Sequence, residues 1–118
     1  MISCILLSAG LSLRFGASKA LAKLNGITVI DYEQQILLQS LIDEVVVVLG
    51  AESDKIKPHL LKHKKIKFVY NKDYNLGQTS SFKIGFSAVS KSTLGVVLLP
   101  VDFPVIKSST LDSLVKAF

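Results

Sequence analysis

ISCILLSAGLSLRFGASK, residues 2–19, is the stretch that decides the fold predicted for this chain. It opens with an apolar run and changes at Ser8 to small and polar residues that include two cations, Arg14 and Lys19. A short apolar run bounded by small residues is typical of a strand buried on both faces, as in a parallel sheet. The sequence therefore predicts a central strand over residues 2–8, followed by a loop.

The loop after this strand has the composition of a phosphate-binding segment. The small residues Ser8, Ala9 and Gly10 allow backbone N–H groups to approach a phosphate closely. Arg14 can neutralise phosphate charge through two hydrogen bonds, and Lys19 can do so as a point charge. The spacing fits neither GxGxxG nor GxxxxGK[ST]. We predict phosphate binding here, the alternative being a plain connection between strand and helix.

The rest of the chain alternates strand-like and helix-like patterns. Strands are expected at 44–49, 66–70 and 95–99, and helices at 29–41, 53–62, 80–90 and from 109 onward. Such alternation predicts an α/β fold, here a Rossmann-like three-layer αβα arrangement with a mostly parallel sheet. A strand order of 3-2-1-4 is expected. It places the first and fourth strands side by side, and ligands bind in the crevice between them.

Local signals mark the expected element ends. Asn25-Gly26 predicts a turn after a short extended piece at 21–24. Pro58 predicts a kink, or a helix that restarts near it. The expected helix caps are Thr28 with Asp31 three residues later, Ser53, Thr79 or Ser80, and Ser109 with Asp112 three residues later.

The composition indicates one globular domain over residues 1–118. The chain is 49% apolar and 19% charged, which is enough to fill a core. Its single cysteine, Cys4, cannot form an internal disulfide, so a buried hydrophobic role in a cytoplasmic protein is expected. The sequence has no apolar run of about 18 residues, and no membrane span is predicted.

The formal net charge of +5 comes largely from lysines between residues 55 and 67. A solvated helix face and the loop after it explain these lysines best. Nucleic acid is not predicted as a partner, because no aromatic residues interleave with them. A positive field also suits a small anionic substrate. His59 and His63 lack acidic or cysteine partners at ligand spacing, so both are expected to be exposed rather than metal ligands.

Asp102 is the candidate metal ligand. It follows the apolar strand at 95–99 and stands between Pro100 and Pro104. Mg²⁺ is usually held by one or two carboxylates together with substrate phosphates and water. A carboxylate across the crevice from a phosphate-binding loop meets that need. The alternative is an aspartate that forms a turn by bonding its own backbone.

A polar segment, NKDYNLGQTSS at residues 71–81, is the third candidate site. Asn71 follows the strand at 66–70, so it is expected at the same sheet edge as Gly10 and Asp102. The hydroxyls and free N–H groups that lead into the next helix can receive an anion or a base edge. Ordinary helix capping by Thr79 or Ser80 is the alternative.

Together these motifs resemble the nucleotidyltransferases that activate molybdenum cofactor. LLSAGLSLRFGASK is similar to their LAAGxSxRFGxxK signature loop, and LPVDFP to their DxP motif. Asn71, Gly77-Gln78, Ser81 and Gly85 match the NxxxxxGQxxSxxxG pattern of the molybdopterin cytidylyltransferase branch. The resemblance covers essentially the whole chain. Phe103 departs from the family, which frequently has methionine or glutamine there.

The resemblance implies a GT-A-like fold that transfers a nucleoside monophosphate from an NTP to a phosphate-bearing acceptor such as molybdopterin, with CTP favoured over GTP and Mg²⁺ as cofactor. Catalytic roles fall to Lys19, Arg14 and Asp102, with Asp102 as the Mg²⁺ ligand. The implied nucleotide-binding residues are Leu7, Ser8, Ala9, Gly10, Ser12, Lys19, Asn71, Gly77, Gln78 and Ser81.

Family members continue well past the equivalent of residue 118. The resemblance thus implies that this chain carries the nucleotide-binding portion and lacks most of the acceptor portion. Two alternatives follow. One is a related nucleotidyltransferase whose acceptor is a sugar phosphate or another cofactor. The other is a nucleotide-binding module without a complete catalytic site.

Overall fold

The computed structural model describes residues 1–8, 19–101 and 107–117. The predicted loop at 9–18 and the segment around Asp102 lie outside these residues. The described elements are β1 (Ile2–Ser8), the 3₁₀ turn η1 (Lys19–Leu21), β2 (Lys23–Leu24), β3 (Ile27–Thr28), α1 (Val29–Gln39), β4 (Glu44–Leu49), α2 (Ser53–Ile56), the 3₁₀ turn η2 (Lys57–His59), β5 (Ile66–Tyr70), the 3₁₀ turn η3 (Tyr74–Leu76), α3 (Gln78–Ala88), β6 (Gly95–Pro100) and α4 (Ser108–Ala117).

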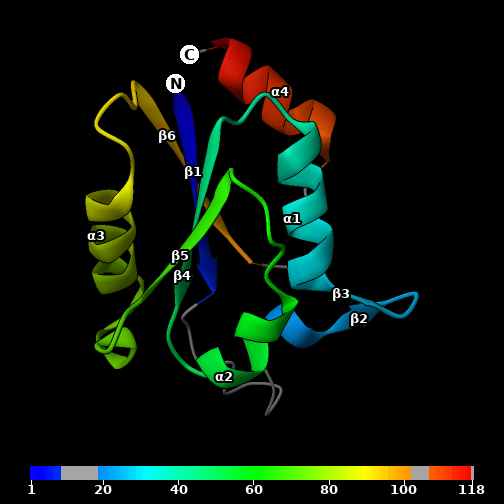
Figure 1. Cartoon of the computed structure of the whole chain (residues 1–118), viewed down its shortest axis with the longest axis vertical. Helices are drawn as coiled ribbons and strands as arrows, with labels where there is room; N and C mark the ends of the chain where they lie inside the picture. The colour runs from blue at the N-terminus through cyan, green and yellow to red at the C-terminus, as the bar shows by residue number, and fades with distance from the viewer. Residues whose placement is uncertain (9–18, 102–106, 118) are drawn as a thin grey trace.

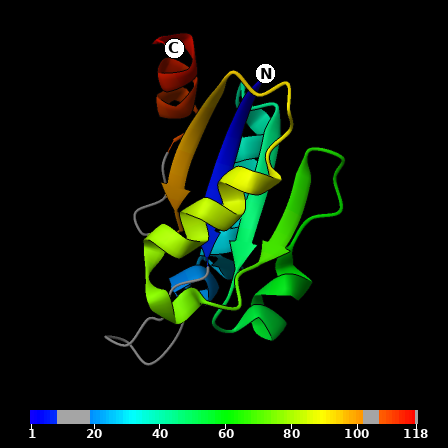
Figure 2. The ribbon, with the colours of Figure 1, turned by 90° about the vertical axis from the view of Figure 1, so that its left-hand side faces the viewer.

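The main sheet has four strands in the order β5-β4-β1-β6, and every neighbouring pair is parallel (Figure 1). This confirms the predicted order 3-2-1-4, because β1, β4, β5 and β6 are the four predicted strands in sequence. In register, Ser8 lies opposite Leu49, and Leu49 lies opposite Tyr70. Leu7 lies opposite Pro100 on the other side of β1. The strand ends therefore meet at one edge of the sheet, as Figure 2 shows.

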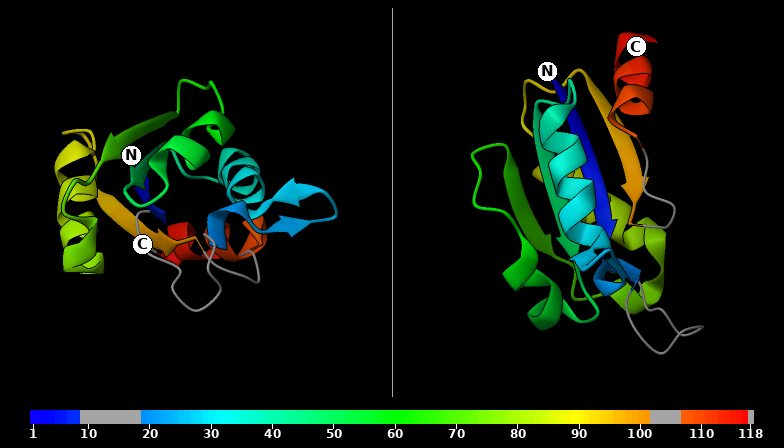
Figure 3. Two further views of the ribbon diagram at one scale, coloured as in Figure 1. Left: turned by 90° about the horizontal axis from the view of Figure 1, so that it is seen from below. Right: turned by 90° about the vertical axis from the view of Figure 1, so that its right-hand side faces the viewer.

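Helices cover both faces of the sheet, which gives the three predicted layers (Figures 1 and 3). Successive side chains of β1 point to opposite faces of the sheet, as strand geometry requires. Cys4 and Leu6 join the core beneath α1 and α4, whereas Ile5 and Leu7 pack with Phe82 of α3 on the other side. The apolar run of β1 is thus buried on both faces, as the sequence predicted.

Most local predictions around α1 are confirmed. The Thr28 hydroxyl accepts a hydrogen bond from the Asp31 N–H at 3.3 Å and donates to the Asp31 carboxylate at 2.7 Å, so Thr28 caps the helix. Of the extended piece predicted at 21–24, only Lys23–Leu24 form a strand, β2, because Leu21 belongs to η1. The predicted turn at Asn25-Gly26 joins β2 to β3, and both turn residues have positive φ angles of 53° and 84°. The helix ends at Gln39, two residues earlier than predicted.

Three predicted helix caps are wrong. Glu52, in a left-handed conformation at φ 60°, precedes α2 in place of Ser53. Gly77 precedes α3 in place of Thr79 or Ser80, because α3 begins two residues earlier than expected. The helix α4 begins at Ser108, so Ser109 lies inside it. The Asp112 carboxylate accepts from the Leu41 N–H at 2.8 Å, so it ties α4 to the end of α1 rather than closing a cap.

The break predicted near Pro58 is confirmed, since α2 ends at Ile56 and continues as the 3₁₀ turn η2 with Pro58 near its start. The predicted helix at 53–62 is wrong at its end, because η2 stops at His59 and residues 60–62 are not helical. The prediction that both histidines are exposed is wrong for His59. His59 Nδ1 lies 3.1 Å from the Asp31 carboxylate, and the side chain is only partly exposed.

No helix among the described residues has both the length and the apolar character that crossing a membrane requires.

Cys4 is fully buried, as predicted. Burial and, secondarily, the negative charge of Glu33 raise the pKa of the Cys4 thiol to about 12. The thiol therefore stays protonated near neutral pH and serves as a small hydrophobic side chain.

Glu44, at the start of β4, joins three segments through one carboxylate. Its Oε1 accepts from the Ser3 hydroxyl and from the Ser90 N–H, both at 2.8 Å, and its Oε2 lies 3.1 Å from Lys67 Nζ. Burial on its own raises the pKa of Glu44, but the hydrogen bonds from Ser90 and Ser3 and the charge of Lys67 together hold it below its usual value.

We expect Glu44→Gln to destabilise the protein by about 1–2 kcal/mol at pH 7. A lowered pKa in the folded state stabilises the fold above the unfolded-state pKa of about 4.3, and this contribution disappears as pH falls through the folded-state pKa. Urea denaturation across pH 3–7 should thus show that the stability difference between the original protein and Glu44→Gln shrinks below about pH 4. Glu52→Gln is the matched control, because the Glu52 side chain caps no helix. A stability difference that is independent of pH would contradict the role assigned to the Glu44 carboxylate.

Candidate functional site

The candidate site lies at the carboxyl edge of the sheet, where β1, β4 and β5 end. Ligands of open α/β sheets bind at this edge, next to the strand where the chain order reverses. That strand is β1, because the chain leaves it toward β4 on one side and later returns to β6 on the other. The Val101 N–H donates to the Leu7 carbonyl at 2.9 Å. Val101, the residue that follows β6, therefore lies beside the end of β1.

The two predicted residues in β1 are bound into the sheet. The Leu7 side chain is buried among the residues that pack against α3. The Ser8 hydroxyl is also buried and donates to the Val48 carbonyl at 2.9 Å. These contacts fix the end of β1. Ala9, Gly10, Ser12 and Arg14 lie outside the described residues.

Asn71 forms a hydrogen-bonded clamp just beyond β5. Its backbone N–H donates to the Leu49 carbonyl at 2.7 Å, which continues the pairing of β5 with β4. Its side-chain amide nitrogen donates to the hydroxyls of Ser80 at 2.9 Å and Ser81 at 3.0 Å. Its side-chain oxygen accepts from the Asp73 N–H at 3.0 Å. The side chain is 1% exposed, so one buried amide ties the sheet edge to the start of α3.

Gly77 sets the backbone of the turn before α3. Its φ of 102° and ψ of 177° fall in a region that is essentially restricted to glycine. Its carbonyl accepts from the Ser80 N–H at 3.2 Å and from the Ser80 hydroxyl at 2.8 Å. Gln78 follows as the exposed first residue of the helix. The structure thus brings Asn71, Gly77 and Ser81 together, with Gln78 beside them.

We expect Gly77→Ala to cost about 1–3 kcal/mol of stability, although a Cβ there would meet no atom within 4 Å. The cost is conformational, because an L-residue avoids this backbone region. Urea denaturation measures it, and Gly26→Ala serves as a comparison, since Gly26 also has open space but a φ of 84° in the β2–β3 turn. An unchanged stability in Gly77→Ala would contradict the assigned backbone geometry.

The remaining predicted residues are described only in part. Lys19 opens η1, and the next residue, Ala20, is buried. The Lys19 side chain lies outside the described positions, as does Asp102. In the described part of the chain, no three histidine, cysteine, aspartate or glutamate side chains gather in a metal-binding arrangement.

The sequence-based predictions did not include the roles of two residues, one beside this edge and one within α1. Ser80 was considered only as a helix cap, yet its hydroxyl bonds Asn71 and also donates to the Asp73 carbonyl at 3.0 Å. Glu33 of α1 carries a carboxylate that is 1% exposed. The signal for Glu33 was available, because it follows Val29 and Ile30 at the helical spacing of the buried face.

The comparisons with known proteins fit this architecture. Residues 4–118 match the family described as MobA-like NTP transferase domain. The chain belongs to this family. No curated protein matches the chain in sequence. The family match confirms the resemblance to nucleotidyltransferases that the three motifs indicated.

Solved structures share the fold over 98% of this chain. A Mycobacterium sp. strain JC1 homologue of the Mycobacterium tuberculosis protein Rv0371c matches with a TM-score of 0.84 and 28% identity, with 58% of its own length covered. A nucleotidyl transferase from Methanothermobacter matches with a TM-score of 0.83, 24% identity and 57% coverage. A manganese complex of the M. tuberculosis protein matches with a TM-score of 0.77, 20% identity and 58% coverage. The chain therefore spans less than three fifths of the length of each of these structures.

Proposed function

We propose that this chain provides the nucleotide-binding portion of a nucleotidyltransferase that uses CTP in preference to GTP. In the reaction, a phosphate oxygen of the acceptor attacks the α-phosphorus of the NTP. A new P–O bond forms, the bond between the α-phosphorus and its bridging oxygen breaks, and pyrophosphate leaves. Molybdopterin is the proposed acceptor. Such in-line displacement depends on positioning and charge neutralisation rather than on a covalent enzyme intermediate.

The clamp at Asn71 is the observation that carries this proposal. It fixes the Gly77-Gln78 turn and Ser81 at the edge where β1 leads into the signature loop. The proposal therefore joins two segments that resemble the family's nucleotide-binding motifs, although they are more than fifty residues apart in sequence. The preference for CTP rests on Gly77-Gln78, which resembles the cytidylyltransferase branch.

The proposed charge-neutralising groups are Arg14 and Lys19, which would hold the NTP phosphates and the departing pyrophosphate. Both belong to the loop that leaves β1 at this edge. A guanidinium can bind a phosphate through two hydrogen bonds, while an ammonium acts as a point charge. Ala9, Gly10 and Ser12 would contribute backbone N–H groups and a hydroxyl to the same phosphates.

Mg²⁺ is the proposed cofactor, with Asp102 as its ligand. The hydrogen bond from Val101 to Leu7 brings the chain that leads into Asp102 to the end of β1. A hard cation held by one carboxylate, phosphate oxygens and water fits that donor set. Bound there, Mg²⁺ would supply Lewis-acid stabilisation of phosphoryl charge. The manganese complex of Rv0371c is consistent with a divalent cation in a protein of this fold.

The decisive experiment measures nucleotide binding and pyrophosphate release separately. With CTP, Mg²⁺ and molybdopterin, we expect a raised Tm and pyrophosphate release that is greater than with GTP or ATP. Lys19→Ala and Asp102→Ala should each lower turnover at least tenfold, equivalent to about 1.4 kcal/mol. The matched controls are Lys91→Ala and Asp54→Ala, which change an exposed lysine and an exposed aspartate elsewhere. Turnover near that of the original chain in either site variant would refute the assignment.

The chain spans 57–58% of the length of the related structures. The second candidate function is a nucleotide-binding module without turnover. Stabilisation by CTP without pyrophosphate release would support it. Turnover with a sugar phosphate and not with molybdopterin would instead identify a related transferase with a different acceptor. No stabilisation by any NTP would exclude both nucleotide functions.

A further inference from the structure

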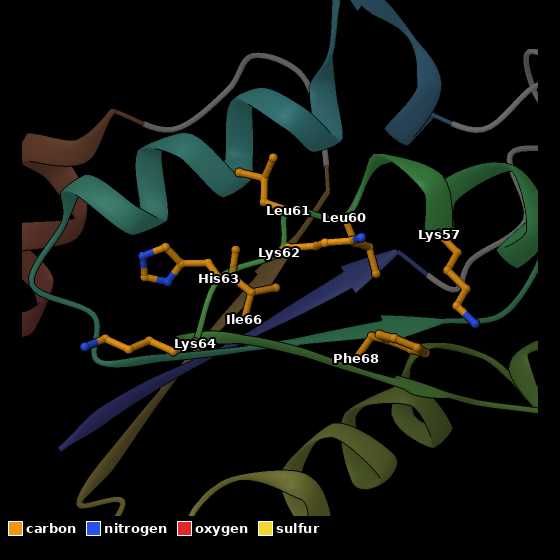
Figure 4. A pocket seen from close by; sticks show the side chains of 8 residues that line it. All are labelled: Lys57, Leu60, Leu61, Lys62, His63, Lys64, Ile66 and Phe68. Carbon is orange, nitrogen blue, oxygen red and sulfur yellow. The ribbon is translucent and has the colours of Figure 1, made fainter.

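A hollow lies along β5, and none of the residues predicted to bind nucleotide lines it. It has a volume of about 470 Å³ and lies between β5 and the segment at 60–64 (Figure 4). Leu60, Ile66 and Phe68 give it apolar walls. Phe68, in β5, is 45% exposed, which is high for a phenylalanine in a strand of the main sheet. The hollow therefore exposes an apolar surface of the kind that binds another molecule.

The wall of this hollow is held in place by α1. The buried side chain of Gln34 donates to the His59 carbonyl at 2.9 Å and accepts from the Leu61 N–H at 2.8 Å. Asp31 contacts the His59 ring at 3.1 Å. These bonds tie His59 and Leu61 to α1. The hollow is consequently a built feature of the fold.

Beside the hollow, β5 exposes an unpaired edge, since β4 is its only neighbour in the described sheet. The Lys65 carbonyl accepts from Val45 and the Asn71 N–H donates to Leu49, so odd-numbered residues of this strand pair with β4. Backbone bonding alternates along a strand. The N–H groups of Phe68 and Tyr70 therefore point toward the open edge. A further strand can bond to them.

The edge is strongly positive. Residues 52–67 contain six lysines but only two carboxylates, Glu52 and Asp54. Lys62 and Lys64 border the hollow and are exposed, and neither takes part in an ion pair within the described structure. Lys57 Nζ lies 4.9 Å from the centre of the Phe68 ring, which places another cation over the apolar wall. A segment that binds here must bring negative charge as well as apolar side chains.

We propose that the open edge of β5 binds an extended acidic segment of a partner protein, which adds to the sheet as a further strand. Main-chain bonds to Phe68 and Tyr70 supply part of the affinity, and alternate side chains of the segment enter the hollow. Acidic residues of the segment pair with Lys62 and Lys64. Lysines on an edge can also serve only to prevent strand pairing. The apolar hollow next to them distinguishes this edge, because protection alone requires no such hollow.

The test uses the full chain and a fluorescein-labelled peptide of about eight residues, in which glutamate alternates with valine, a length that spans β5. Fluorescence anisotropy should show saturable binding. Lys62→Glu/Lys64→Glu should weaken it at least tenfold. Lys91→Glu, which reverses an exposed lysine before β6 on the opposite edge, should change it less than twofold.

Two further comparisons isolate the backbone contribution. Phe68→Pro removes one outward N–H without removing a bond to β4, and should weaken binding at least tenfold more than Phe68→Thr, which removes the ring but keeps the N–H. Circular dichroism and a Tm within a few degrees verify that each variant is folded. A peptide N-methylated on alternate residues should not bind.

Absence of binding up to about 1 mM peptide would overturn the proposal and leave the lysines as protection against strand pairing. Equal binding of the N-methylated peptide would overturn strand addition. Tighter binding of a peptide in which lysine replaces glutamate would overturn the charge argument. Binding of single-stranded RNA with higher affinity than the acidic peptide would assign the surface to polyanions instead.

Discussion

Replacing Asn71 by leucine is expected to lower the free energy of unfolding by about 3 kcal/mol and to weaken CTP binding at least tenfold. Leucine has the same number of non-hydrogen side-chain atoms with the same branching, so no cavity results. It can neither donate to the hydroxyls of Ser80 and Ser81 nor accept from the Asp73 N–H. Three hydrogen bonds at about 1 kcal/mol each account for the loss of stability.

Asn71→Leu is expected to weaken CTP binding because Asn71 positions other residues, not because it contacts the nucleotide. Both amide hydrogens of Asn71 are directed to serine hydroxyls within the protein, and the side chain is 1% exposed. We therefore expect Asn71 to hold the Gly77 turn and α3 in place while other atoms touch the nucleotide. Ser80→Ala should weaken CTP binding in the same direction but to a smaller degree, because it removes only part of the clamp.

Urea denaturation measures the change in stability, and isothermal titration calorimetry with CTP and Mg²⁺ measures binding. Asn75→Leu is the matched control, since Asn75 is an exposed asparagine in the same loop, and it should change stability by less than about 0.5 kcal/mol. Equal stability of Asn71→Leu and Asn75→Leu would disprove the clamp. A stability loss with unchanged CTP affinity would leave the clamp intact but separate it from nucleotide binding.

The sequence predicted the sheet well because its signals are local and redundant. Four β-branched or apolar runs alternate with helical segments, and right-handed crossovers allow few strand orders. The caps were less predictable, because several residues compete at each helix start. Near α3, Thr79 and Ser80 both have capping side chains, yet Gly77 takes the position through its backbone conformation. Near α4, Asp112 forms a bond with Leu41 that no local pattern encodes.

For the candidate site, the sequence predicted which residues take part but not how they are arranged. The spacing of Asn71, Ser81 and Gly85 matches a family motif, and a motif does not distinguish ligand contact from support. The geometry gives Asn71 and Ser81 hydrogen bonds to each other and places Gly85 against the sheet. The position of Gly85 depends on the packing of α3 against β1, and these two elements lie at least seventy residues apart in sequence.

Gly85 allows α3 to lie close to the sheet. A Cβ at this position would lie 2.6 Å from Ile5 Cγ2 and 2.9 Å from Val48 Cγ2, distances that side chains cannot adopt without movement. Ser81, one helical turn earlier, is the other buried residue of α3. Two small residues four positions apart thus stand on the buried side of α3, which also carries Phe82. A larger side chain would push the helix outward and strain the clamp at its start.

Gly85→Val is accordingly expected to destabilise the protein by about 3 kcal/mol or more, and Gly85→Ala by less. At a helix position with open space, replacing glycine by alanine would instead stabilise the protein by about 1 kcal/mol. Destabilisation by Gly85→Ala would therefore indicate that the new Cβ meets the sheet. Ser87→Val, on the exposed face of the same helix, is the control and should cost less than about 1 kcal/mol.

A double-mutant cycle locates the clash. Combining Gly85→Ala with Val48→Ala removes the methyl group that lies 2.9 Å from the new Cβ, so the double variant should lose at least 0.5 kcal/mol less stability than the two single variants together. Strict additivity would show that the helix accommodates the methyl group by moving as a whole. Because α3 begins at the clamp, that outcome would predict a larger loss of CTP affinity than of stability, which calorimetry on the same variants measures directly.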